Sequence, residues 1–137
     1  MQTDQGEQTE QTGGVERLEE ERWRSRPVLV FADAGQEALR VAQQQVFDAV
    51  SAGLRERDIT VYVVTPEGVT RDGEALAGDG QKLRSRYGVT REAWAVVLVG
   101  KDGGEKLRVT DGVLDTERLF GVIDAMPMRR AEMERRR

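Results

Sequence analysis

Two residue types that serve much of enzyme chemistry are missing from this chain of 137 residues, which contains no cysteine and no histidine. Without cysteine there is no thiolate nucleophile, no disulfide and no redox-active thiol pair. Without histidine there is no imidazole base and no imidazole metal ligand. A transition-metal site would have to rest on carboxylates alone, which is uncommon. We therefore expect no metal and no cofactor.

The sequence Asp33-Ala34-Gly35-Gln36 stands between an apolar run and the first residues of a helical pattern. The free N–H groups at the start of a helix can hold an anion, so Asp33 and Gln36 are candidate ligand-binding residues. The simpler interpretation is that Asp33 caps the helix, because aspartate is one of the preferred capping residues. We favour the cap.

Other candidate motifs fail on their spacing. Gly100-Lys101 is followed by Asp102, so it lacks the Ser or Thr of a phosphate-binding loop, and a hairpin turn is favoured. The carboxylates Asp72, Glu74 and Asp79 could hold Ca²⁺, but the EF-hand spacing is absent. The serines have no Gly-x-Ser-x-Gly context and no histidine to activate them.

The string Met126-Pro127-Met128-Arg129-Arg130 is the candidate partner surface, because methionine is an adaptable residue common at binding surfaces. We expect Met126 and Met128 to pack on the fold and Arg129 and Arg130 to remain at the surface. The arginines either serve solubility, which we favour, or meet an acidic partner.

These residues are positioned by a strand–helix–strand unit. Residues 28–32 form a continuous apolar run, which indicates a strand covered on both faces. Apolar residues at helical spacing predict a helix over about 35–57, and residues 59–64 are a second strand. The two strands should be parallel, since a helix connects them.

The second half of the chain, from residue 66, predicts a loop, a short helix, two strands and a last helix. Residues 66–80, rich in glycine, predict a long surface loop, and residues 81–87 predict one or two helical turns. Residues 94–99 and 107–109 predict two strands joined by a tight turn at 101–104. A last helix is capped by Asp115 or Thr116, and Pro127 disfavours its continuation.

The element order β-α-β-α-β-β-α predicts an α/β thioredoxin-like domain, with a mixed central sheet of about four strands and flanking helices. We place this domain at residues 26–133. Residues 1–14 are predicted to be disordered, 15–25 to form a charged edge segment, and 134–137 to be a basic tail.

The formal net charge of −4 argues against a nucleic-acid partner, because such binders usually carry a basic field. No apolar run is long enough to span a membrane. The expected partner is an unidentified protein or a second copy. The location is cytoplasmic as the sequence stands, or periplasmic or secreted if a leader was removed.

The chain resembles a bacterial domain family of unknown function, which is similar to the peroxiredoxin-like domains of secreted animal sushi-repeat proteins. The resemblance covers about residues 26–133, and its most specific parts are the 101–104 hairpin and the string IDAMPMRR. It rests on four stretches: RPVLVFA at 26–32, ERDI at 56–59, VVLVGKDGG at 96–104 and LFGVIDAMPMRR at 119–130.

The resemblance implies a thioredoxin-like fold and no settled activity. Where that fold places its reactive cysteines, this chain has Asp33-Ala34-Gly35-Gln36. The redox enzymes of the fold also place a cis-proline just before the third strand, and residues 91–94 of this chain contain no proline. We therefore expect a non-catalytic interaction domain that performs no thiol chemistry. The alternatives are a cysteine-independent enzyme or anion site at Asp33, and a structural or stress-associated oligomer subunit.

Overall fold

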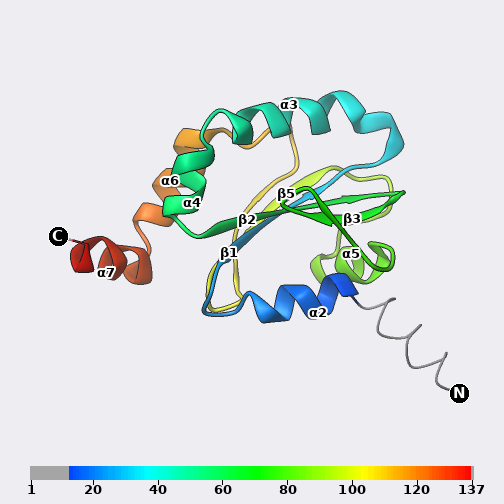
Figure 1. Cartoon of the computed structure of the whole chain (residues 1–137). Coiled ribbons are helices and arrows are strands. Elements are labelled where there is room, and N and C mark those ends of the chain that lie inside the picture. Colours follow the sequence, from blue (N-terminus) through cyan, green and yellow to red (C-terminus); the bar gives the residue numbers. More distant parts are fainter. Residues whose placement is uncertain (1–12, 137) are drawn as a thin grey trace, which may run out of the picture.

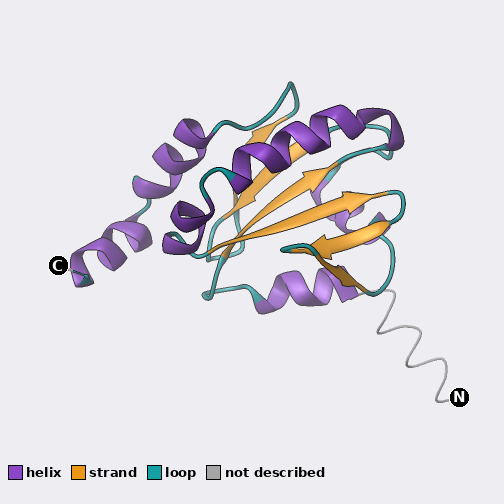
Figure 2. Ribbon diagram, turned by 45° about the horizontal axis from the view of Figure 1, so that its top comes forward, coloured by secondary structure: helices purple, strands orange, loops and turns teal. Residues whose placement is uncertain are grey.

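The computed structural model describes residues 13–136 of the chain. At its centre lies a mixed sheet with the strand order β4-β3-β2-β1-β5-β6 (Figures 1 and 2). β1 and β2 run parallel, and every other neighbouring pair runs antiparallel. The strands are β1 (Arg26–Phe31), β2 (Ile59–Thr65), β3 (Gly68–Arg71), β4 (Glu74–Leu76), β5 (Ala95–Val99) and β6 (Glu105–Val109).

Continuous apolar runs occupy the middle of the sheet, as the sequence predicts. Every residue of β1 and of β5 is buried. Side chains alternate between the two faces, so Val28 and Val30 belong to one apolar cluster while Leu29 and Phe31 belong to the other. The predicted mixed sheet and the parallel pairing of the first two strands are confirmed.

Helices cover both faces (Figure 1). One face carries α3 (Glu37–Asp48), α4 (Ser51–Glu56) and α6 (Thr116–Asp124), through Phe47, Leu54 and Ile123 among others. The opposite face carries α2 (Gly13–Glu20) and α5 (Gln81–Tyr87), through Leu18 and Leu83. The helix predicted over 35–57 is divided into a 3₁₀ turn (Ala34–Gln36), α3 and α4.

The sheet has six strands rather than about four, because the predicted loop 66–80 contains the β3–β4 hairpin. Asp72 and Gly73 both adopt positive φ, 49° and 86°, which is the geometry of a tight two-residue hairpin turn. The strands are only four and three residues long. Because the strands are so short and the segment is rich in glycine, the sequence pattern predicts a loop here instead of a hairpin.

The N-terminal charged segment is part of the fold. Leu18 of α2 is buried in the same cluster as Leu29 and Phe31, and Glu21 after it is buried among polar partners. The segment 1–14 that we predict to be disordered lies outside the described residues, apart from Gly13 and Gly14 at the start of α2.

The C-terminus holds one more helix than predicted. Asp115 caps α6 as expected, accepting a hydrogen bond of 2.8 Å from the Arg118 N–H. That helix ends at Asp124, and Pro127 begins a further helix, α7 (Pro127–Arg135). Proline is well suited to a first helical position, where its missing N–H costs nothing. α7 runs through the first part of the segment 134–137, which we predict to be a basic tail.

Candidate functional site

The turn after β1 is closed by Gln36. Its side-chain oxygen accepts a hydrogen bond of 2.7 Å from the Asp33 N–H, and its amide nitrogen donates one of 2.9 Å to the Glu92 carbonyl. Gln36 therefore ties the end of β1 to the loop before β5. This arrangement supports the capping interpretation of the turn, with Gln36 as the residue that makes the bonds.

A small pocket of about 80 Å³ lies beside this turn, and its most unusual lining residue is Arg84 of α5. Only 5% of Arg84 is exposed. Its Nη1 donates to the Thr90 carbonyl at 2.8 Å and its Nη2 to the Ala32 carbonyl at 3.2 Å. Arg84 thereby holds the loop before β5 against the end of β1.

Burial lowers the pKa of the Arg84 guanidinium, and the nearby charge of Asp33 offsets this only in part. Arg91, which also lines the pocket, lowers the pKa further. Sequence reasoning missed Arg84, because the charged run around α5 gives no sign of which arginine turns inward.

The C-terminal candidates differ from expectation. Met126 packs against the cluster of Val28 and Val30 as predicted, but 40% of Met128 is exposed. Arg130 is exposed as predicted, whereas Arg129 is only 1% exposed. The reason is the direction of α7, which turns Arg129 toward the body and Met128 toward solvent.

Arg129 lies among carboxylates of two other helices. Its Nη2 lies 2.7 Å from Glu56 Oε2 and its Nε 3.3 Å from Asp124 Oδ1. Asp124 also pairs with Arg57 at 2.9 Å. The pKa of Asp124 is lowered, chiefly by the hydrogen bond from Arg57. These ion pairs join α4, α6 and α7.

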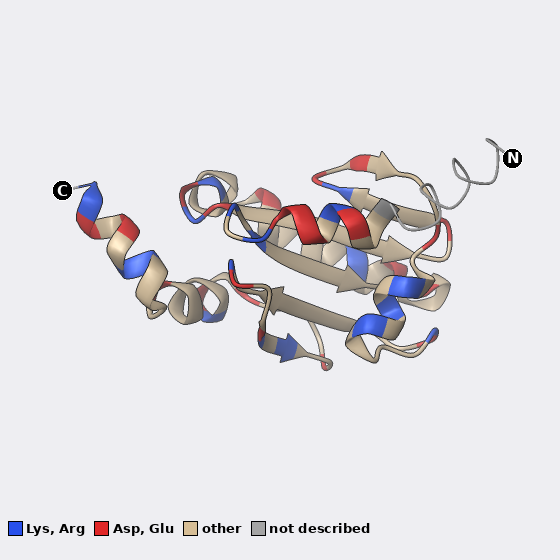
Figure 3. Ribbon diagram, turned by 90° about the horizontal axis from the view of Figure 1, so that it is seen from below, with Lys and Arg blue, Asp and Glu red and all other residues tan. Residues whose placement is uncertain are grey.

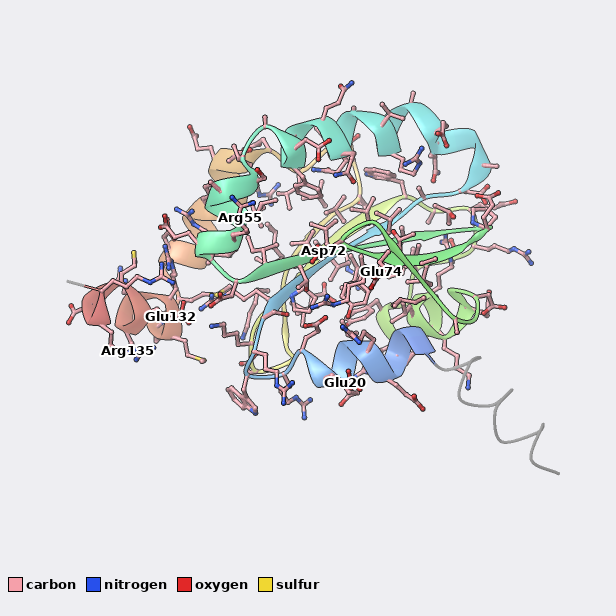
Figure 4. The ribbon with its side chains drawn as sticks, viewed as in Figure 1. Glu20, Arg55, Asp72, Glu74, Glu132 and Arg135 are labelled. Atoms are coloured by element: carbon pink, nitrogen blue, oxygen red, sulfur yellow. The ribbon has the colours of Figure 1, made fainter. Side chains whose placement is uncertain are left out.

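A second cluster joins α7 to the sheet through Glu132, which Figure 4 labels on that helix. Glu132 pairs with Arg26 of β1 at 3.1 Å and with Lys101 of the β5–β6 turn at 2.8 Å. Lys101 also pairs with Asp58 at 2.8 Å. Burial alone would raise the pKa of Glu132, but its hydrogen bonds with Lys101 and Arg26 outweigh this and lower it. Residues of both charge signs lie along α7 (Figure 3).

Glu21 organises the polar contacts on the other face. It accepts a 2.7 Å hydrogen bond from Ser25 and one of 2.6 Å from Arg71, and Tyr62 also donates to it. Burial and the bond to Glu21 raise the pKa of Tyr62. Thus the predicted edge segment supplies a buried carboxylate to the sheet.

A groove of about 740 Å³ lies between α3 and strands β2 to β4. Its apolar lining includes Phe47, Val61 and Val63. On β3 and β4 the paired residues Thr70 and Ala75 also line it. Because these two side chains are small, they leave the space beneath α3 unfilled.

The rim of this groove is acidic. Its charged residues are four carboxylates and one arginine: Glu37, Arg40, Asp48, Glu67 and Asp72. Arg40 is already paired with Glu37. Figure 4 shows Asp72 at the turn between β3 and β4, below α3. The groove therefore combines apolar lining residues with an excess of negatively charged ones.

No metal-binding cluster is found within the described residues. The loop carboxylates have local roles instead: Asp72 accepts from the Val61 N–H at 2.8 Å and Asp79 from the Gln81 N–H at 3.1 Å. Between residues 13 and 136, no helix has the length and apolar character needed to cross a membrane.

Solved structures of similar shape identify the fold. The chain resembles the reduced 2-Cys peroxiredoxin of Plasmodium vivax with a TM-score of 0.61 and 15% identity, over 83% of this chain and 84% of that one. A secreted Mycobacterium tuberculosis disulfide oxidoreductase homologous to E. coli DsbE gives a TM-score of 0.47 and 16% identity, over 74% and 82%. The fold is thioredoxin-like, and the chain contains no cysteine.

The family follows from the sequence itself. Residues 17–132 match the model of the domain of unknown function DUF4174. The chain therefore belongs to the DUF4174 family. A search of curated proteins finds no match.

Proposed function

We propose that this domain is a non-catalytic binding module, and that its groove between α3 and strands β2 to β4 holds an apolar and basic segment of another protein. The observation that carries the proposal is the groove itself. Its volume of about 740 Å³ falls in the range of ligand sites, and the apolar residues Phe47, Val61 and Val63 are part of its mixed lining.

Charge complementarity selects the kind of partner. The four rim carboxylates favour lysine or arginine side chains that flank an apolar anchor. β4 lies at the edge of the sheet, so its backbone is also open to an added strand. A nucleic-acid partner is disfavoured, because this rim would repel phosphate groups.

Two features support a non-catalytic role. The chain has no thiol, and the turn where thioredoxin-like enzymes hold their reactive cysteines is closed by Gln36. We also propose that the protein is bacterial and that it is related to the peroxiredoxin-like domains of sushi-repeat proteins. The sequence IDAMPMRR at residues 123–130 of this chain supports that relationship.

The test is an NMR titration of the ¹⁵N-labelled protein with two short peptides, one alternating leucine with lysine and one alternating leucine with glutamate. We expect saturable shifts at Val63, Thr70 and Ala75 with the lysine peptide alone. Thr70→Arg should abolish them by filling the groove, whereas the matched control Thr110→Arg, on the exposed residue after β6, should not.

Equal binding of both peptides, or shifts confined to another surface, would overturn the proposal. Sedimentation of the unliganded protein at the same concentrations shows whether a second copy occupies the groove. A dimer broken by Thr70→Arg would contradict the choice of a basic peptide as the occupant.

A further inference from the structure

We propose that the pocket beneath Arg84 binds a small oxyanion, a carboxylate or a tetrahedral phosphate or sulfate group. The pocket shares only Thr65 with the lining of the groove, and this inference does not rest on the function proposed above. It rests on a comparison of the buried cations in the described part of the chain.

Four cationic side chains are buried among the described residues: Arg26, Arg84, Lys101 and Arg129. Three of them have a carboxylate oxygen within 3.1 Å, from Glu132 or Glu56. Arg84 instead donates to the two carbonyls of Thr90 and Ala32 and lies over the ring of Phe31, 5.7 Å from its centre, and no described carboxylate forms an ion pair with it. A buried charge without a counter-ion is costly, so Arg84 is the exception that needs explaining.

The donors of Arg84 are not exhausted by these contacts. A guanidinium carries five N–H groups, and the two carbonyl bonds use two of them. Its planar fork matches the paired oxygens of a carboxylate or phosphate. Because the same carbonyl bonds fix the side chain, it is positioned before any ligand arrives.

Part of the remaining pocket lining suits a small anion. Arg91 adds a second positive charge to the lining, and the loop residues Gly80 and Gln81 complete one side. The volume of about 80 Å³ is roughly that of two or three water molecules, which suits a single oxyanion group. The lowered pKa of Arg84 agrees with a charge that burial destabilises and that a bound anion would stabilise.

Two carboxylates, Asp33 and Asp79, also line the pocket and compete with an anion. Asp33 acts on Arg84 through its charge but makes no ion pair with it, so it compensates the arginine only in part. This competition supplies a sharp test, because removing the Asp33 charge should strengthen anion binding while both hydrogen bonds of Arg84 remain.

The experiment titrates the ¹⁵N-labelled full chain with inorganic phosphate and, separately, with acetate at constant ionic strength. The readouts are the Arg84 Nε–H signal and the amides of Gly80 and Gln81. We expect saturable shifts that Asp33→Asn makes about fivefold tighter and Arg91→Gln about fivefold weaker. Asp111→Asn, at an exposed carboxylate outside the pocket, should change nothing.

The two probes distinguish the ligand geometry. Shifts with phosphate alone assign a tetrahedral anion, and shifts with acetate assign a carboxylate; either result supports the site. No saturable shift with either probe would overturn the proposal, as would equal affinity of the wild type and Asp33→Asn. Asp33→Asn and Arg91→Gln both leave the hydrogen bonds from Arg84 to the Thr90 and Ala32 carbonyls in place. We therefore expect both variants to fold.

Discussion

At the scale of single residues, the neighbours Arg129 and Arg130 show how position in the fold separates identical side chains. Arg129 is 1% exposed and pairs with Glu56 and Asp124, whereas Arg130 is exposed. Both carry the same charge and have nearly the same neighbours along the chain. Only the docking of α7 against α4 and α6 distinguishes them.

We therefore predict different effects on stability. Arg129→Gln should lower the free energy of unfolding by about 1–3 kcal/mol, less than for a fully buried pair because Glu56 and Asp124 are partly exposed. Arg130→Gln, the matched control, should change it by less than about 0.5 kcal/mol. Urea unfolding at neutral pH measures both. Equal effects of the two changes would contradict the assigned contacts of α7.

At the scale of elements, the packing of α4 against α6 depends on Gly53. A Cβ atom at this position would lie 2.8 Å from the ring of Phe120, and the Arg57 guanidinium lies 3.8 Å from the centre of the same ring. The Phe120 ring thus packs against both Gly53 and Arg57. The glycine, which weakens the helix in isolation, allows the close approach.

Two helical glycines should consequently respond in opposite directions. Gly121→Ala in α6 meets nothing within 4 Å, so it should stabilise the protein by about 0.5–1 kcal/mol through higher helix propensity. Gly53→Ala should destabilise it, because the new methyl group displaces Phe120. Thermal unfolding gives the sign of each change. Stabilisation by Gly53→Ala as large as that by Gly121→Ala would show that the ring moves freely.

At the scale of the whole molecule, the buried carboxylates set the response of stability to acid. Burial raises the pKa values of Glu21 and Glu132, but hydrogen bonds from cationic or hydroxyl partners outweigh it and leave both values below 4.5. A carboxylate whose pKa is lower in the folded state stabilises the fold above its unfolded pKa. That contribution is lost as the pH falls through the folded value.

We predict that the free energy of unfolding is nearly constant between about pH 6 and 8, since the chain has no histidine, and falls below about pH 4.5. Glu132→Gln should be less stable than the wild type at neutral pH, and the gap should close in acid, where the wild-type residue is also uncharged. Glu134→Gln, at an exposed position on the same helix, is the control. A gap that stays constant down to about pH 2–3 would exclude the proposed ion pairs of Glu132.

The N-terminus supplies a second prediction at this scale. Removing residues 1–12 should leave the melting temperature within about 2 °C of the full chain, because Val15 and Leu18 supply the apolar contacts of α2. Removing residues 1–25 should destabilise the fold strongly, since Glu21 would no longer pair with Arg71 or bond Tyr62. Circular dichroism melts of the two shortened chains test this. A large loss from the shorter deletion would mean that residues 1–12 contribute to the fold.

Sequence by itself determined the features that depend on neighbouring residues. The apolar runs of β1, β2 and β5, the Asp115 cap and the tight turn at 101–104 follow from periodicity, capping and turn geometry, which act within a few positions. The absence of cysteine is enough to exclude thiol chemistry. The turn at Asp33 could be marked as a candidate from the sequence, but the bonds that Gln36 makes there could not.

Only the tertiary structure decided which charges are buried and what they meet. Arg26 and Glu132 are 106 positions apart, Arg129 and Glu56 are 73, and Arg84 and Ala32 are 52. No local pattern marks such a residue, because an arginine on a charged helix looks the same whether it faces water or the body. The groove likewise arises where α3 passes over the small residues Thr70 and Ala75, and that crossing is set by the packing of distant elements.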